Sequence, residues 1–254
     1  MKLAAATFAT LVLIQLFGSE VEAQKRPALK AKPTTARSGE IGQSAVVIDE
    51  TLSVLRKEPS LFSEPVHRMQ RGRKVTIQGV TEADGVKFYK VVAPPTSFGW
   101  VQADAVFGKF RASDEDRFSK LIQATDGFDQ VEMAHEYFDM YPSSPNKPLI
   151  LLLYGDLLEE WAARHTKEAN SQLKRAEMAA SAAPMHSYFL NFVKLDRFRK
   201  LGIIFLFNST TKQFHYDGAS WKEIVTKFPA SAQAAEAKKR LDALSLKMEK
   251  AAAK

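Results

Sequence analysis

The spacing of apolar residues changes after Phe107, and this change constrains the fold more than any other feature of the chain. Before it, the apolar residues fall in short runs rich in β-branched and aromatic side chains, such as VTIQGV and VKFYKVV. In the first of these, Val75 and Ile77 alternate with polar residues, which is typical of a strand buried on one face only. After Phe107 the apolar residues recur at helical spacing. The sequence therefore predicts an α+β chain of more than one domain, with strands first and helices after them.

Turn residues separate the strands of the first part. Gly72 and Gly85 supply the positive φ that a chain reversal requires, and the dipeptide Asp84-Gly85 is a strong hairpin signal. Short strands at such close spacing favour a small closed β-barrel. We place this barrel at residues 45–108.

Four short motifs occur in order within this block. They are Leu55-Arg56 with Pro59-Ser60 after it, Arg71-Gly72-Arg73-Lys74-Val75, Phe88-Tyr89-Lys90-Val91 and Gly99-Trp100-Val101. Together they make the block resemble a bacterial SH3-like (SH3b) domain. The chain departs from that family at Phe88, where the family usually has Trp, and in the loop that carries Pro94-Pro95. The departures concern the ligand surface more than the fold.

The resemblance implies an extracytoplasmic binding module that holds cell-wall peptides or partner proteins. It places the aromatic residues of the block around a groove or in the core beneath it, with basic residues as neighbours. The expected ligand-binding residues are Arg56, Phe88, Tyr89, Phe98 and Trp100. Because adjacent strand residues point to opposite faces, we expect one ring of the pair Phe88 and Tyr89 to be exposed. The alternative is that Tyr89, Val91 and Trp100 only fill the small barrel.

Residues 113–248 are predicted to be helical. The apolar run that begins at Pro148 indicates a central buried helix, and a small hairpin is expected at 203–216, where a frayed helix end is the alternative. The segments YFDMYPSSP and IVTKFPASA both pair an aromatic-Pro break with a following helix. In this they resemble divergent TPR-like helical hairpins, which stack on one another to bury their apolar faces. The resemblance implies an interaction scaffold.

The N-terminal residues predict export. Lys2, the apolar stretch from Leu3 to Phe17 and the small residue Ala23 have the order of a secretory signal, which we assign to residues 1–23. An uncleaved membrane anchor is the alternative. Residues 24–44 read as a basic linker, either a solvated spacer or a tether to anionic envelope polymers or lipid headgroups. The expected location is the periplasm or cell envelope, and membrane contact is expected only through an uncleaved signal or this linker.

Several chemistries lack their residues. The chain has no Cys, which excludes disulfides, thiol catalysis and Cys-ligated zinc. The five histidines lack the spacing of metal ligands, so we expect no metal site, no cofactor and no catalytic residues. The most site-like cluster is His215-Tyr216-Asp217-Gly218, for which a turn-stabilising role competes with a shared proton network. The formal net charge of +7 is dispersed, so no nucleic-acid partner is expected.

These observations favour a non-enzymatic exported envelope protein. Its SH3-like module would bind a peptidoglycan peptide or an envelope protein, and its helical region would act as an interaction scaffold. The alternatives are an accessory or regulatory subunit of a cell-wall hydrolase, and an enzyme with an unrecognised site.

Overall fold

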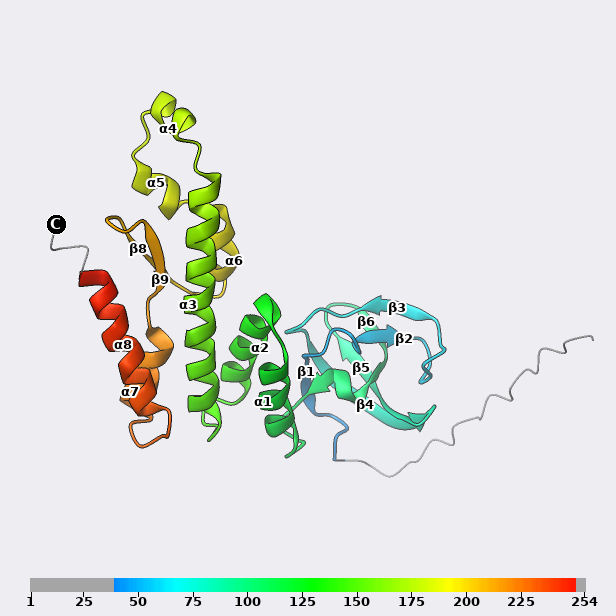
Figure 1. The fold of residues 1–254 in the computed structure, drawn as a ribbon. Coiled ribbons are helices and arrows are strands. Elements are labelled where there is room, and N and C mark those ends of the chain that lie inside the picture. Colours follow the sequence, from blue (N-terminus) through cyan, green and yellow to red (C-terminus); the bar gives the residue numbers. More distant parts are fainter. Residues whose placement is uncertain (1–38, 250–254) are drawn as a thin grey trace, which may run out of the picture. The chain divides into compact units, whose positions relative to one another are not determined.

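The computed structural model describes residues 39–249. The predicted signal at 1–23 and most of the predicted linker at 24–44 lie outside the described residues. The described chain consists of a curled antiparallel sheet followed by a helical region, so the α+β class predicted from the sequence is confirmed (Figure 1).

The sheet has seven strands in the order β3-β2-β6-β5-β4-β1-β7. All neighbouring strands are antiparallel. A 3₁₀-helix, Ala103–Ala105, joins β6 to β7, the last two of these seven strands along the chain. The strands are β1 (Ser44–Val47), β2 (Val54–Arg56), β3 (Pro65–Arg68), β4 (Lys74–Ala83), β5 (Val86–Ala93), β6 (Ser97–Gln102) and β7 (Val106–Phe107).

The local sequence explains the long hairpin formed by β4 and β5. In β4, Val75 and Ile77 are buried while their polar neighbours are exposed, as alternation predicts. A bulge between Ile77 and Gly79 shifts the register and bends the strand. The turn is made by Asp84 and Gly85, both at positive φ. These features give the sheet the curvature that encloses its own core.

The helical region contains eight α-helices within residues 39–249. They are α1 (Asp114–Ala124), α2 (Gly127–Met140), α3 (Lys147–Gln172), α4 (Arg175–Ser181), α5 (Met185–Leu190), α6 (Asp196–Arg199), α7 (Ala219–Lys227) and α8 (Ala234–Glu249). Helix α3 packs against α2 and against α7, and α7 packs against α8 (Figure 1). None of the helices in this part of the chain is both long enough and apolar enough to cross a bilayer.

A second, two-stranded sheet lies within the helical region. Strands β8 (Phe205–Asn208) and β9 (Gln213–Tyr216) pair as an antiparallel hairpin inside the segment 203–216. Strand β9 packs against α3. The backbone N–H of Phe214 donates to Thr166 Oγ1 on α3 at 2.8 Å, which fixes the hairpin to that helix.

Two apolar cores meet at the boundary between sheet and helices. The interior of the curled sheet is closed by residues such as Leu55, Ile77 and Tyr89. Ile48, which follows β1, and Phe107 on β7 belong to the helical core instead. The ring of Phe107 lies 5.3 Å from that of Phe118 on α1. The helical core therefore extends to the sheet through these two residues.

Candidate functional site

Tyr89 lies in the core of the sheet and is fully buried. Its hydroxyl donates to Glu40 at 2.7 Å, and Arg111 Nη1 donates to it at 3.4 Å. Burial, together with the hydrogen bond to Glu40, raises the pKa of this phenol well above its usual range. Tyr89 thus fills the interior with Val91, as one of the two sequence interpretations proposed.

Phe88 is also fully buried, so the prediction that one ring of the pair is exposed is wrong. Alternation does turn the two rings to opposite faces of β5. The outer face is nevertheless closed at this point. The loop between β2 and β3 is held at the β4–β5 turn, where Asp84 Oδ2 accepts from Ser60 Oγ at 2.7 Å and from Leu61 N at 2.8 Å. Phe88 is thus covered on the outer face as completely as Tyr89 is in the interior.

The other expected residues share the outer face of the sheet. Register pairs Arg56 on β2 with Trp100 on β6, and Trp100 with Lys90 on β5, which pairs in turn with Gly79 on β4. A side chain at Gly79 would lie 3.9 Å from Trp100 Cη2 and 3.4 Å from Lys90 Cβ. The half-buried indole therefore extends from β6 towards β4, over space that the glycine leaves empty. Trp100 does not fill the barrel interior.

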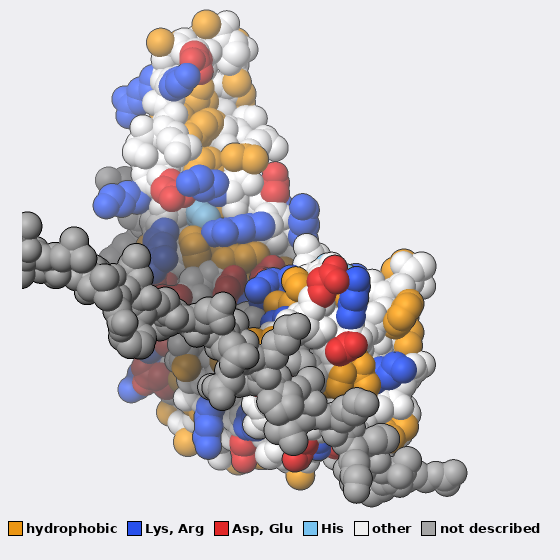
Figure 2. All heavy atoms as spheres, turned by 90° about the vertical axis from the view of Figure 1, so that its right-hand side faces the viewer, with side chains coloured by type: hydrophobic (Ala, Val, Ile, Leu, Met, Phe, Trp, Pro, Cys, Tyr) orange, Lys and Arg blue, Asp and Glu red, His pale blue; other side chains and the backbone are white. Residues whose placement is uncertain are grey.

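Phe98 completes this face, two residues before Trp100 on the same strand. Its side chain is 72% exposed. We call the set Arg56, Lys90, Phe98 and Trp100 the outer face. On the side of the molecule drawn in Figure 2, hydrophobic side chains lie among Lys, Arg and acidic side chains. An exposed ring of this size next to a half-buried indole is a natural contact for a ligand.

The charges of the outer face are basic. Lys90 is exposed and makes no ion pair with any described residue. Arg56 Nη1 donates to the carbonyl oxygen of Ser63 at 2.7 Å, while its Nε is buried without a partner. The guanidinium is therefore held in place by the β2–β3 loop and retains unused donors. The arrangement offers an aromatic platform flanked by two cations, which suits a ligand with carboxylates and apolar groups.

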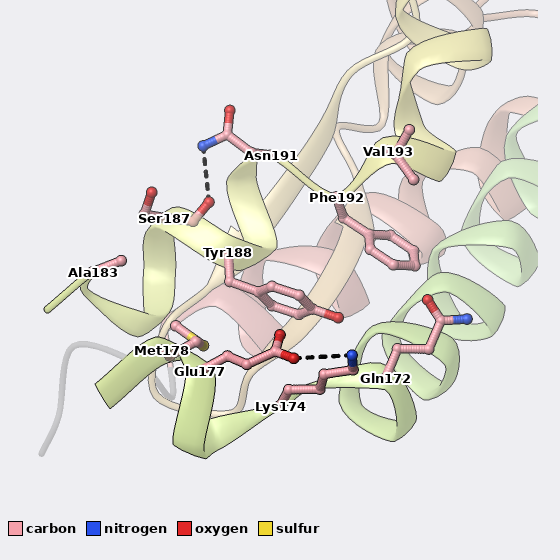
Figure 3. A pocket seen from close by; sticks show the side chains of 10 residues that line it. All are labelled: Gln172, Lys174, Glu177, Met178, Ala183, Ser187, Tyr188, Asn191, Phe192 and Val193. Carbon is pink, nitrogen blue, oxygen red and sulfur yellow. Dashed lines mark hydrogen bonds and ion pairs between the residues drawn. The ribbon is translucent and has the colours of Figure 1, made fainter. Parts of the chain in front are cut away.

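The helical region has a groove of its own, of about 740 Å³, between the end of α3 and helices α4 and α5 (Figure 3). Several of its polar side chains are bonded within the protein: Lys174 pairs with Glu177 at 3.0 Å, and the Tyr188 hydroxyl donates to the Ala169 carbonyl at 3.0 Å. The surface left for a ligand is mostly apolar, from Met178, Phe192 and Val193 together with the Tyr188 ring, and also includes the polar side chains Gln172 and Ser187. Helix α4 buries none of its residues, so the groove is open on that side.

The side chains of His215, Tyr216 and Asp217 bind different partners, although Glu159 also accepts from the Tyr216 backbone N–H at 2.9 Å. His215 Nδ1 lies 2.9 Å from Glu159 Oε1, and the Tyr216 hydroxyl accepts from Ser220 N at 2.8 Å. Asp217 accepts from Ala219 N at the start of α7, where Gly218 has φ +76. No shared proton network forms, and the cluster builds the turn into α7. Among residues 39–249, no three His, Asp or Glu side chains are grouped as metal ligands.

Comparisons with protein-family models, with curated proteins and with solved structures give no significant match for this chain.

Proposed function

We propose that the chain is an exported, non-enzymatic envelope protein whose sheet is an SH3-like module that binds a peptidoglycan peptide through the outer face. The observation that supports this most is the solvent-exposed Phe98 beside Trp100 and the unpaired ammonium of Lys90. Peptidoglycan peptides carry free carboxylates close to the methyl groups of alanine residues. Such groups bind to cations next to aromatic rings.

The order of elements is consistent with the SH3-like part of the proposal. Strand β1 pairs with both β4 and β7, the long β4–β5–β6 meander supplies the rest of the sheet, and a 3₁₀-helix precedes the last strand. Phe88, to which the resemblance assigns a position at the groove, is fully buried. The proposed ligand surface is therefore the Phe98 and Trp100 side of β6.

The helical region is proposed as a TPR-like scaffold. The chain of contacts from α1 through α2, α3 and α7 to α8 has the stacked character that such helical pairs need. An envelope protein is the second candidate partner, and the open groove beside α4 and α5 favours it, since its free surface is apolar. A role as accessory subunit of a cell-wall hydrolase would use this same groove.

Co-sedimentation of the mature protein with purified peptidoglycan tests the proposal. We expect Phe98→Ala to weaken binding by on the order of tenfold, as losses at an aromatic anchor typically do. Lys90→Ala should weaken binding less than Phe98→Ala does. Its effect should be larger at low salt than at high salt, because salt screens the charge of the ammonium. Leu246→Ala is the control, because Leu246 is 60% exposed but lies on α8, outside the sheet.

Three results would count against the outer face. Equal binding by wild type and Phe98→Ala, or an equal loss with Leu246→Ala, would remove it as the binding surface. Peptidoglycan binding abolished by Val193→Asp, with Phe98→Ala unaffected, would move the site to the helical groove. Mass spectrometry of the cell-envelope fraction tests export, for which we expect a mature chain that begins at Gln24.

A further inference from the structure

The turn from α5 into α6 has an exposed side that neither the sequence motifs nor the proposed function uses. It is built from the end of α5, the 3₁₀-helix η2 (Val193–Leu195) and α6. Phe192, Leu195 and Phe198 recur at intervals of three and are buried, so the residues between them face solvent. We call the exposed side of residues 190–200 the α5–α6 surface.

The α5–α6 surface is basic. Residues 190–200 contain four Lys and Arg residues and one Asp, which gives this short stretch a net charge of +3 in a chain whose total is +7. Two of the four cations are paired. Lys194 Nζ lies 3.1 Å from Glu168 Oε2, and Arg199 Nη1 lies 2.9 Å from Asp196 Oδ1.

Arg197 and Lys200 carry the charge that remains. Both are exposed, and neither forms an ion pair with another residue in the described part of the chain. The guanidinium of Arg197 lies 4.3 Å from the centre of the Phe128 ring and 4.7 Å from that of Trp161. These rings hold the guanidinium in place without neutralising it. One short turn therefore presents two uncompensated positive charges.

Two large aliphatic side chains lie on the same stretch. Val193 is 69% exposed and stands at the edge of the groove beside α4 (Figure 3). Leu190 is 49% exposed and is joined to α6, because the guanidinium of Arg199 donates to its carbonyl oxygen. Single exposed aliphatic residues are common, but here two of them occur within the most basic turn. A partner that covers the whole surface must combine negative charge with apolar contact.

We propose that the α5–α6 surface binds an anionic lipid bilayer. The phosphates of the headgroups would pair with Arg197 and Lys200, and the side chains of Val193 and Leu190 would enter the boundary between headgroups and acyl chains. A soluble polyanion offers the same charge but leaves both aliphatic side chains in water. The bilayer is therefore the partner that uses both properties of the surface. The contact is peripheral and reversible, since few charges and little apolar area take part.

Co-sedimentation with vesicles tests this. The mature chain from Gln24 is used, because the apolar stretch from Leu3 to Phe17 would enter a bilayer by itself. The vesicles contain either phosphatidylcholine alone or equal parts of phosphatidylcholine and phosphatidylglycerol. We expect binding to the anionic vesicles only, and weaker binding as salt is raised. Lys200→Glu should weaken it about tenfold or more, and Val193→Ser about threefold or more.

Exposed residues elsewhere supply the matched controls. Lys120→Glu makes the same change of charge on α1, and Leu246→Ser removes a 60% exposed aliphatic side chain on α8. Both variants should bind the vesicles as the wild type does. Phe98→Ala should also leave vesicle binding unchanged, so that this proposal and the peptidoglycan proposal can fail separately.

The basic linker needs its own control, since its charges also attract anionic lipids. In a chain that carries Lys30→Glu and Lys32→Glu, Lys200→Glu should still lower binding by the same factor. Absence of binding to both kinds of vesicle, or equal losses with Lys200→Glu and Lys120→Glu, would overturn the proposal. So would unchanged vesicle binding by Val193→Ser together with tighter binding to heparin than to vesicles, which would identify a soluble polyanion as the partner.

Discussion

Asp114 is a carboxylate with no exposure to solvent, and it joins the sheet to the first helix. It accepts from Gly108 N at 2.9 Å, from Arg111 Nε at 2.8 Å and from Arg117 Nη1 at 3.0 Å. Asp114→Asn would leave the largely buried Arg111 without its counter-charge, and we expect a loss of about 3 kcal/mol in the free energy of unfolding. Urea denaturation measures it. Asp104→Asn, which removes an exposed partner of Arg117, should cost less than about 1 kcal/mol.

We expect His165 to make the stability depend on pH. It is buried among the rings of Trp161, Phe198 and Phe205, and neither ring nitrogen has a hydrogen-bond partner, although Glu168 Oε2 lies 3.7 Å from Nδ1. Burial lowers its pKa and outweighs the opposing effect of Glu168, while Arg197 and Lys194 add to the lowering. The unfolded chain therefore binds a proton at this position that the folded chain does not.

It follows that the stability contributed by neutral His165 is complete above about pH 6.5, the ordinary pKa of histidine, and is lost as the pH falls below it. Thermal denaturation between pH 7.5 and 5 should show a declining Tm. His165→Phe should flatten that decline, whereas substitution of the exposed His186 by Gln should leave it intact. A parallel decline in wild type and His165→Phe would assign the effect to other groups.

At the scale of elements, the contact between α3 and α7 depends on one glycine. A Cβ on Gly155 would lie 2.3 Å from Trp221 Nε1 and 2.5 Å from Ser220 Oγ. Gly155→Ala should therefore push the two helices apart and cost about 1 to 3 kcal/mol, although the same change in a free helix is stabilising. Ala163→Gly, on the exposed side of α3, measures the difference in helix propensity between Ala and Gly alone, which is about 1 kcal/mol. If Gly155→Ala were instead more stable than the wild type, α7 would be able to move away from the added methyl group without losing packing against α3.

The strands and helices could largely be predicted because their signals are local. The Asp84-Gly85 turn and the alternation around Val75 place β4 and β5 from the sequence alone. The burial of Phe88 could not be predicted, because alternation gives only the face of β5 on which a ring lies and not what covers that face. The room that Gly79 leaves for the Trp100 indole depends likewise on the register of three strands.

The cavity lined by Phe138, Tyr154 and Tyr216 shows the same limit more strongly. Phe138, Tyr154 and Tyr216 come from α2, α3 and β9, and no spacing in the sequence links them. The predicted outer-face residues Arg56 and Trp100 were found together only because strand pairing joins them, and Tyr89 was separated from them by alternation. A residue type can suggest a role, but its neighbours across the fold decide whether solvent or a ligand can reach it.

At the scale of the whole molecule, Ile48 links the stability of the sheet to that of the helices. It is fully buried in the helical core although it follows β1. Ile48→Ala should lower the free energy of unfolding by about 2 to 5 kcal/mol, and it should lower the melting temperature of the sheet and of the helices together. Differential scanning calorimetry and Trp fluorescence should give coincident transitions. The block 45–108 expressed alone should be less stable than in the full chain, since Ile48 and Phe107 would face water.

The shared core also bears on the order in which the protein can acquire its structure. A polypeptide emerges with its N-terminal end first, so the strands are complete before α1 and α2 exist to cover Ile48 and Phe107. During that interval the nascent sheet presents two large apolar side chains to its surroundings, a condition that favours association with other chains or with chaperones. The ion pair of Arg71 with Glu132 on α2 also forms only after this interval. Nascent chains stalled before residue 118 should therefore be protease-sensitive in the sheet, and those that extend past α2 should be protected.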